Sequence, residues 1–256
     1  MKSWLIALFC LLAMKAHAFT MFSWNIHRGV GTDGKLDIER TAALIREQKA
    51  DVVVLQEVDQ GTARSGKRFL AKELADRLGM RMFFGKAIDF QGGEYGQAIL
   101  SDHPMRETRV VRLSEQGEAR IAVLAEVQVG GEWVTVGGVH LDAVSGPRRA
   151  EEGKVLWAAM ATKPGKIYLA GDWNEKPHDA VGQMAAKAGW FYQKKTGVPF
   201  TVPEEKPDTE IDFFLTKGVP PAADCRVIAV HGASDHRGVL ARWPTVAADS
   251  IRQAKP

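Results

Sequence analysis

Leu169-Ala170-Gly171-Asp172-Trp173-Asn174 is an apolar run that ends in an acid and an amide. Short apolar runs are typical of buried strands, and a carboxylate at the end of one is unfavourable to bury unless it is paired or binds a metal. One such cluster is ordinary, but the chain carries five more. They are Ser23-Trp24-Asn25-Ile26-His27, Leu55-Gln56-Glu57-Val58, Gly137-Gly138-Val139-His140-Leu141-Asp142, Ile211-Asp212-Phe213 and Ser234-Asp235-His236. The pattern predicts strand ends that converge on one hydrolytic site.

The composition is that of an ordinary globular protein. The 256 residues are 45% hydrophobic and 25% charged, which is enough for one large core or two small domains. We find no internal repeat, no low-complexity stretch and no linker that would mark a domain boundary. We therefore expect a single domain over residues 19–256.

The first eighteen residues are typical of a signal peptide. Lys2 precedes the apolar stretch Trp4–Met14, and Ala16-His17-Ala18 is a small-residue cleavage site. We expect cleavage after Ala18 and a secreted or periplasmic protein. The stretch is too short to span a membrane comfortably, so we expect no stable membrane insertion. Loss of Lys2 and Lys15 would lower the formal net charge from +3 to +1, which argues against a strongly basic, non-specific nucleic-acid binder.

Strand and helix patterns alternate along both halves of the chain. We expect helices over residues 37–48, 69–78, 147–160 and 178–188. We expect strands over residues 19–26, 52–56, 121–129, 133–139, 167–170, 211–215, 226–230 and 238–243. Helices that flank mixed strands favour a layered α/β sandwich.

Seven blocks, in this order, resemble the endonuclease/exonuclease/phosphatase superfamily, which includes pancreatic-type deoxyribonuclease, AP endonucleases, sphingomyelinases and inositol-polyphosphate phosphatases. The blocks are Trp24-Asn25-Ile26, Leu55-Gln56-Glu57-Val58, Tyr95-Gly96-Gln97-Ala98-Ile99-Leu100-Ser101, Val139-His140-Leu141, Gly171-Asp172-Trp173-Asn174, Ile211-Asp212 and Ser234-Asp235-His236. The opening block is most similar to small secreted bacterial members. The resemblance implies a four-layer α/β/β/α sandwich of the deoxyribonuclease I-like kind, with two packed mixed sheets between helices.

The resemblance also implies a divalent metal site. Glu57 would be the principal ligand, and Asn25 and Asp235 would complete or support the shell. The clusters are rich in oxygen ligands and nearly free of thiols, which suits Mg²⁺, Mn²⁺ or Ca²⁺. Such an ion would polarise a phosphoryl oxygen.

The remaining polar residues of the blocks would carry the chemistry. Asp172 would orient and deprotonate the attacking water, and Asn174, two residues on, would donate to a non-bridging oxygen. His140 and His236 would stabilise charge on the phosphoryl or leaving group. Asp212 would hold His236 in the required tautomer.

Three further residues are candidates for binding the phosphate of the substrate: Tyr95, Arg120 and Arg64. Arg64 lies in Gly61-Thr62-Ala63-Arg64-Ser65-Gly66-Lys67, which matches the phosphate-cradling loop of nucleotide hydrolases as far as Lys67. Arg68 follows where that loop needs Ser or Thr for Mg²⁺, so we do not assign an ATPase.

The leading function is hydrolysis of a phosphodiester by a monomeric, metal-dependent enzyme. The substrate would be a small molecule, a lipid head group or DNA. The first alternative is a DNA endonuclease, which the nearly neutral charge and short chain disfavour. The second is a catalytically inactive secreted binding module, which the complete set of acids, amides and imidazoles disfavours.

Overall fold

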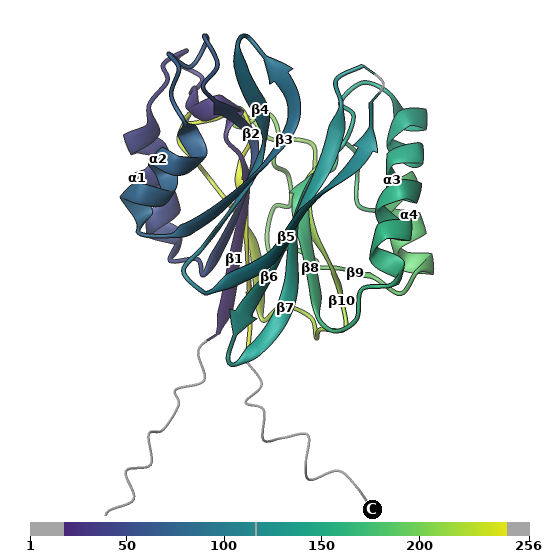
Figure 1. Ribbon diagram of the computed structural model, residues 1–256. Helices are drawn as coiled ribbons and strands as arrows, with labels where there is room; N and C mark the ends of the chain where they lie inside the picture. The colour runs from purple at the N-terminus through teal and green to yellow at the C-terminus, as the bar shows by residue number, and fades with distance from the viewer. Residues whose placement is uncertain (1–17, 116, 245–256) are drawn as a thin grey trace, which may run out of the picture.

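The computed structural model describes residues 18–115 and 117–244, which form two sheets packed face to face (Figure 1). The first sheet contains, in spatial order, β11 (Asp224–Ile228), β12 (Gly238–Trp243), β1 (Phe19–Asn25), β2 (Val52–Gln60), β4 (Gly93–Ser101) and β3 (Arg81–Phe90). The second contains β5 (Met105–Ser114), β6 (Arg120–Val129), β7 (Glu132–His140), β8 (Ile167–Asp172), β10 (Asp212–Lys217) and β9 (Phe191–Tyr192).

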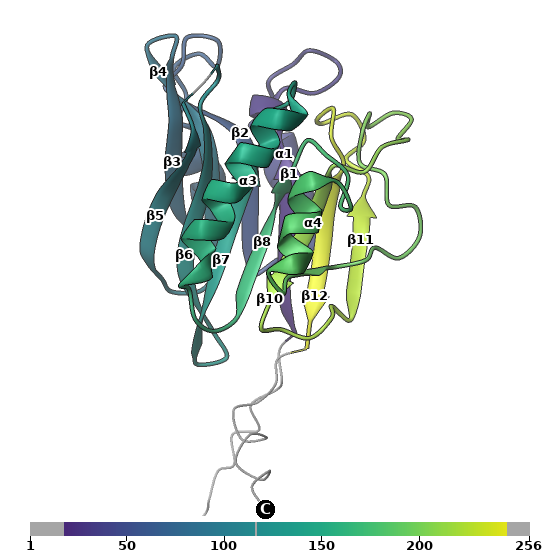
Figure 2. The same cartoon turned by 90° about the vertical axis from the view of Figure 1, so that its right-hand side faces the viewer.

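Helices cover the outer face of each sheet. The first sheet is covered by α1 (Ile38–Gln48) and α2 (Leu70–Leu78), and the second by α3 (Gly146–Ala161) and α4 (Ala180–Lys187) (Figures 1 and 2). The layers therefore run helix, sheet, sheet, helix, which confirms the predicted sandwich. The predicted signal peptide lies outside the described residues except for Ala18, and no helix among the described residues is long and apolar enough to cross a membrane.

Helix boundaries follow local capping signals. The side chain of Asp37 accepts a hydrogen bond from the amide of Arg40 at the start of α1. Ser145 does the same for Arg148 at the start of α3, where Pro147 lies in the first turn. These caps fix where the loops before α1 and α3 end.

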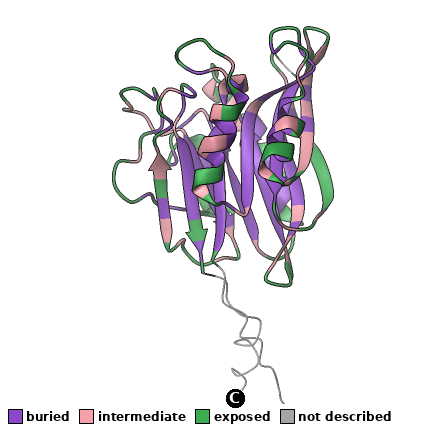
Figure 3. Cartoon of the chain, turned by 90° about the vertical axis from the view of Figure 1, so that its left-hand side faces the viewer, coloured by how far each residue is buried: buried purple, intermediate pink, exposed green. Residues whose placement is uncertain are grey.

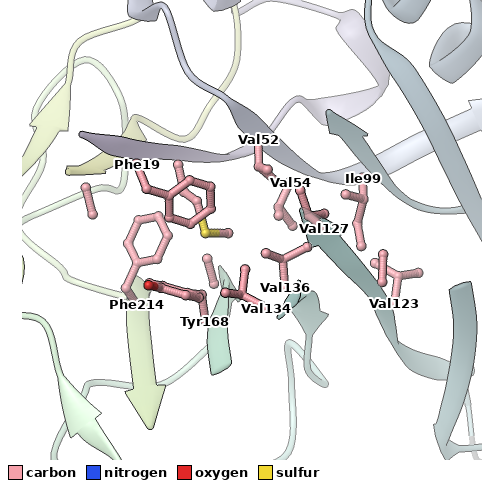
Figure 4. Close-up of a cluster of buried hydrophobic side chains, with 14 of the residues drawn as sticks. Phe19, Val52, Val54, Ile99, Val123, Val127, Val134, Val136, Tyr168 and Phe214 are labelled. Carbon is pink, nitrogen blue, oxygen red and sulfur yellow. The ribbon is translucent and has the colours of Figure 1, made fainter. Parts of the chain in front are cut away.

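The main core lies between the sheets (Figure 4). It is built from inward-facing valines of both sheets, such as Val54 and Val123, and from an aromatic cluster at one end in which Phe19, Tyr168 and Trp243 make ring contacts. Most strands are buried along most of their length, with β3 and β5 as the more exposed ones, whereas the outer surfaces of the helices are exposed (Figure 3). Each sheet thus has one face in the shared core and one under its helices.

Leu74 anchors α2 to the first sheet. Its side chain is fully buried in the cluster that joins α1 and α2 to β1, β2 and β4. We expect Leu74→Ala to lower the free energy of unfolding by ~2–5 kcal/mol, because it leaves a cavity in a packed core. Urea unfolding measures this difference. Lys72→Ala, in the same helix but exposed, should change stability by less than ~0.5 kcal/mol.

The topology brings the predicted strand ends together at one end of the sandwich. β1 and β2 are parallel, as are β7 and β8, so each pair ends on the same edge. Asp172 at the end of β8 lies opposite both His140 and Asp212 in the sheet register. The start of β1 pairs with the end of β12, and these ends lie together at the opposite end of the sandwich (Figure 2).

The structure also contains strands that the sequence patterns did not indicate. β3, β4, β5 and β9 were not predicted, and β2 continues to Gln60 instead of ending at Gln56. β2 is longer because a bulge between Leu55 and Val58 lets pairing with β4 resume after Glu57. This bulge proves important for the site.

Candidate active site

A cavity of about 340 Å³ opens at the end of the sandwich where the strand ends meet. It is lined by Glu57, Arg64, Ile88, Phe90, Tyr95, Glu118, Arg120, His140, Ala143, Asp172, Asn174 and His236. Eight of the eleven residues predicted for the site are in this lining, and Asn25 and Asp212 contact lining residues from behind. Asp235 is the exception, since its side chain is 55% exposed and lies 3.9 Å from His27 Nδ1.

Glu57 points into the cavity because it occupies the β2 bulge with φ of 57°. This left-handed conformation is unfavourable for a residue with a Cβ and is common at functional sites. Glu57 Oε1 accepts a hydrogen bond of 3.1 Å from Asn25 Nδ2. Oε2 receives no hydrogen bond within the described part of the chain, so it is available to a ligand in the cavity.

The strained backbone at Glu57 gives a testable stability difference. We expect Glu57→Gly to be more stable than Glu57→Ala by about 1 kcal/mol, because glycine adopts positive φ without steric conflict. Both variants lose the carboxylate, so the comparison isolates the backbone. Urea unfolding of the two variants measures it, and equal stabilities would contradict the strained geometry.

Asn25 connects two carboxylates of the site. Its Nδ2 donates to Glu57 Oε1 and, at 3.1 Å, to Asp172 Oδ2. Its Oδ1 accepts from the amide of His27 at 3.0 Å, which determines the orientation of the side-chain amide. In this orientation Asn25 supports the two acids and does not present its oxygen to them or to an ion between them.

Asp172 is almost completely enclosed, 1% exposed. Its Oδ2 accepts from Asn25, and its Oδ1 accepts at 3.0 Å from the amide of Asn174, closing a turn. Burial raises the pKa of Asp172 to about 7; the charge of His236 opposes the rise and that of Asp212 adds to it. A carboxylate with a pKa near neutrality is suited to taking a proton from water.

Asn174 lies where the sequence predicted, beside Asp172 on the cavity wall. Its Nδ2 donates one hydrogen bond of 3.0 Å to the carbonyl of Leu141. The amide has a second N–H, which leaves one donor for a ligand. Its backbone has φ of 51°, a conformation that Asn tolerates better than most residues.

His236 and Asp212 form a tightly held pair. His236 Nδ1 lies 3.0 Å from Asp212 Oδ2, and His236 Nε2 lies 3.7 Å from Asp172 Oδ2. Burial alone would lower the pKa of His236, but the charges of Asp212 and Asp172 and the hydrogen bond to Asp212 raise it to about 10. His236 is therefore a cation at neutral pH, with one N–H fixed by Asp212 and the other facing the cavity.

The loop that carries His236 is fastened to β1. Trp24 Nε1 donates to the carbonyl of His236 at 3.0 Å, and Ser234 Oγ donates to the carbonyl of Asn25 at 2.7 Å. All four residues are buried. These bonds explain the sequence cluster around Ser234: the serine positions the loop and has no geometry for nucleophilic attack.

His140 has the opposite electrostatic environment. Burial lowers the pKa of His140 well below its usual range, and the positive charges of Arg120 and His236 lower it further. Arg120 Nη1 lies 3.3 Å from both ring nitrogens of His140, and His140 Nε2 lies 3.6 Å from Asp172 Oδ2. The two histidines thus differ in charge at neutral pH, one neutral and one cationic.

Both arginines of the cavity form ion pairs. Arg120 Nη1 lies 2.9 Å from Glu118 Oε1. Arg64 makes a bidentate pair with the fully buried carboxylate of Asp59, with distances of 2.9 Å from Nε to Oδ2 and 2.8 Å from Nη2 to Oδ1. Asp59 and Glu118 were missed in the sequence because neither ends an apolar run.

These ion pairs leave the cavity with excess negative charge. Among the described residues around it, the carboxylates of Glu57, Asp172 and Asp212 outnumber the remaining cation, His236. Asp172, Asp212 and His236 each offer a ligand atom within 4.8 Å of the others and could hold a metal ion. His236 Nδ1 is already hydrogen-bonded to Asp212, whereas Oε2 of Glu57 receives no hydrogen bond within the described part of the chain, so Glu57 offers a cation a second place.

The loop from Gly61 to Lys67 is not shaped as a phosphate cradle. Thr62 Oγ1 is turned inward to Asp59 at 2.8 Å. Lys67 Nζ donates to the carbonyls of Gln91 and Gly92 in the β3–β4 turn. The loop is therefore attached to the neighbouring hairpin, and the nucleotide-hydrolase interpretation has no support.

Comparison with known families identifies the architecture. A model of the endonuclease/exonuclease/phosphatase family matches residues 22–236. The chain belongs to this family. The match extends from β1 to His236 and so contains every residue of the cavity.

Solved structures of family members share the fold at low sequence identity. An endonuclease/exonuclease/phosphatase from Beutenbergia cavernae is 22% identical, with a TM-score of 0.72 over 89% of this chain and 71% of that one. The mannosyl-6-phosphatase Bt3783 of Bacteroides thetaiotaomicron is 15% identical, with a TM-score of 0.71 over 87% and 98%. A humanized D. rerio TDP2 is 18% identical, with a TM-score of 0.70 over 89% and 99%. No curated protein matches the chain.

Proposed function

We propose that this protein is a Mg²⁺-dependent phosphodiesterase that acts on a small substrate. The observation that carries the proposal is Asp172, a buried carboxylate with a pKa near 7 beside a cationic and a neutral histidine. Membership of a family of hydrolytic enzymes supports it. The cavity volume, about 340 Å³, lies at the low end of the ~300–1,000 Å³ of small-molecule sites, which favours a small substrate over duplex DNA.

The residues have complementary roles in this reaction. Asp172 takes a proton from the attacking water. His236, held by Asp212, presents an N–H to the phosphoryl or leaving oxygen, and Asn174 donates its free N–H to a non-bridging oxygen. Arg120 and His140 lie on the other side of Asp172 from Asp212 and His236, and they donate to the phosphoryl group from that side. Such fixed donors stabilise developing charge without reorganisation.

The residues present fit a hard divalent cation. Glu57 supplies a free carboxylate oxygen, and the cavity carries excess negative charge. When bound, the ion would supply Lewis-acid polarisation of the phosphoryl oxygen. Mn²⁺ and Ca²⁺ fit the same oxygen donors, and Asp235 would have to change its side-chain conformation to join Glu57 as a ligand.

Metal binding is testable without activity. We expect Mg²⁺ at 100 times its Kd to stabilise the protein by about 2.7 kcal/mol, because it binds the folded state only. Thermal unfolding with Mg²⁺ or EDTA measures this effect. Glu57→Gln keeps the shape of the side chain and should remove most of the stabilisation by Mg²⁺. An equal stabilisation in this variant would place the ion elsewhere.

A DNA endonuclease is the second candidate, because the family that matches the chain is described as one of endonucleases, exonucleases and phosphatases. Nicking of supercoiled plasmid, measured beside hydrolysis of bis(4-nitrophenyl) phosphate, separates the candidates. We expect hydrolysis of the small diester and little nicking. Metal-dependent nicking that exceeds small-diester turnover would favour the nuclease instead. We also propose that the protein is secreted or periplasmic, on the sequence of residues 1–18, and that it is a monomer.

A further inference from the structure

One wall of the cavity is formed by residues that have no role in the proposed reaction. It consists of Ile88 and Phe90 at the end of β3, Tyr95 at the start of β4, and Arg64. The Arg64 guanidinium carbon lies 4.4 Å from the centre of the Phe90 ring and 5.2 Å from that of Tyr95. We call these four residues the aromatic wall. The aliphatic and aromatic side chains and the flat guanidinium give it a largely apolar, planar character.

The aromatic wall is pre-formed, because the loop that carries Arg64 is fixed to the β3–β4 hairpin. The amide of Ala63 donates to the carbonyl of Gln91 at 3.1 Å, and the amide of Arg64 donates to Gln91 Oε1 at 2.9 Å. Lys67 Nζ adds bonds to the same turn. A surface held this way loses little conformational entropy when a ligand binds to it.

The charge of Arg64 is already used within the protein. Its Nε and Nη2 donate to Asp59, whose side chain is inaccessible to solvent. The planar guanidinium of Arg64 lies over the rings of Phe90 and Tyr95 in the cavity wall, with Nη1 as a remaining donor. A guanidinium that is paired at its edge and stacked on a ring favours planar partners over a bare phosphate.

We infer that the aromatic wall binds a planar aromatic ring carried by the phosphoester substrate. The inference rests on the proposed function for the position of the phosphate, at the Asp172 side of the cavity. The wall faces the same cavity as the catalytic groups, so one compact ligand reaches both. An aryl ester and a nucleotide base share this chemistry, and the experiment distinguishes them.

Isothermal titration calorimetry on residues 19–256 in Mg²⁺ tests the ring site without requiring turnover. Phenylphosphonate and methylphosphonate carry the same anionic group and differ in the ring. We expect phenylphosphonate to bind ~10-fold more tightly than methylphosphonate. In Phe90→Ala we expect the ratio of the two Kd values to be close to 1. Ile88→Ala should lower the ratio in the same direction, which keeps the test valid if Phe90→Ala folds poorly. Phe191→Ala, an exposed phenylalanine outside the cavity, should keep the wild-type ratio.

A second ligand pair identifies the source of the ring. Thymidine 5′-monophosphate and 2-deoxyribose 5-phosphate differ only in the base. For each pair, the Kd of the ligand without the ring is divided by the Kd of the ligand with it. A larger quotient for the nucleotide pair than for the phosphonates assigns the ring to a nucleobase. A smaller quotient assigns it to a small aryl ester. Equal affinities within both pairs in the wild-type protein would overturn the inference.

Turnover of bis(4-nitrophenyl) phosphate, measured on the same preparation, separates this inference from the proposed function. Ring preference without turnover would overturn the proposed hydrolysis and support the ring site. Turnover without ring preference would overturn the ring site alone.

Discussion

Asp172→Asn is expected to lower kcat for phosphodiester hydrolysis by ~10³- to 10⁴-fold. The substitution keeps the shape of the side chain but replaces a buried carboxylate that lies beside His236 and Asn174 and is placed to accept a proton from water. Its Oδ1 can still accept from the amide of Asn174, and only the hydrogen bond that Asp172 Oδ2 accepts from Asn25 is lost, so the fold should remain intact. Steady-state kinetics on a chromogenic diester measures the change.

The control for this variant is Asp102→Asn. Asp102 is an exposed carboxylate that follows β4 at the opposite end of the sandwich. Its substitution should leave kcat within about twofold of the wild-type value. Circular dichroism and thermal unfolding of both variants establish that they fold. A folded Asp172→Asn variant with wild-type kcat would remove Asp172 from the mechanism.

His236→Ala is expected to lower kcat by ~10³-fold, because it removes the cationic donor that faces the phosphoryl group. His178→Ala is the matched control, since His178 is exposed and outside the cavity, and it should retain wild-type activity. Retention of activity in His236→Ala would assign the donor role to another group.

The pH profile tests the charge states of this pair. Asp172 acts ionised, so activity rises as pH increases through its pKa of about 7. His236 acts protonated, so activity falls as pH increases through its pKa of about 10. The profile is therefore a bell with a broad top between these limits. Asp212→Asn removes a charge that raises the pKa of His236, so its alkaline limb should move to lower pH.

These candidate site residues were predictable because each is a polar residue that follows a buried apolar run. Asn25, Glu57, His140 and Asp172 follow apolar runs, and the parallel pairs β1–β2 and β7–β8 bring those ends to one edge. The seven blocks in order also predicted the family and the four-layer fold. What the strand pattern could not predict is the bulge that turns Glu57 into the cavity, since it depends on pairing with β4.

Tyr95 and Arg64 of the aromatic wall were predicted as substrate-binding residues, whereas Ile88 and Phe90 were missed because their strand lacks a clear hydrophobic period. β3 is half-buried along most of its length, and β5 is largely exposed, with arginines at positions 106, 109 and 112 that interrupt any alternation. Ile88 and Phe90 are two residues apart, which is consistent with one strand face, but the surrounding sequence gave no signal for a strand. Their place in the cavity follows from the β3–β4 hairpin, a tertiary feature.

Hydrolysis of bis(4-nitrophenyl) phosphate by residues 19–256 tests the central claim most directly. The assay compares Mg²⁺ with EDTA and the wild-type protein with Asp172→Asn and Asp102→Asn. We predict release of 4-nitrophenol by the wild-type protein and Asp102→Asn in Mg²⁺, and loss of that release in EDTA and in Asp172→Asn. Equal rates in Mg²⁺ and EDTA, or undiminished release by Asp172→Asn, would contradict the account.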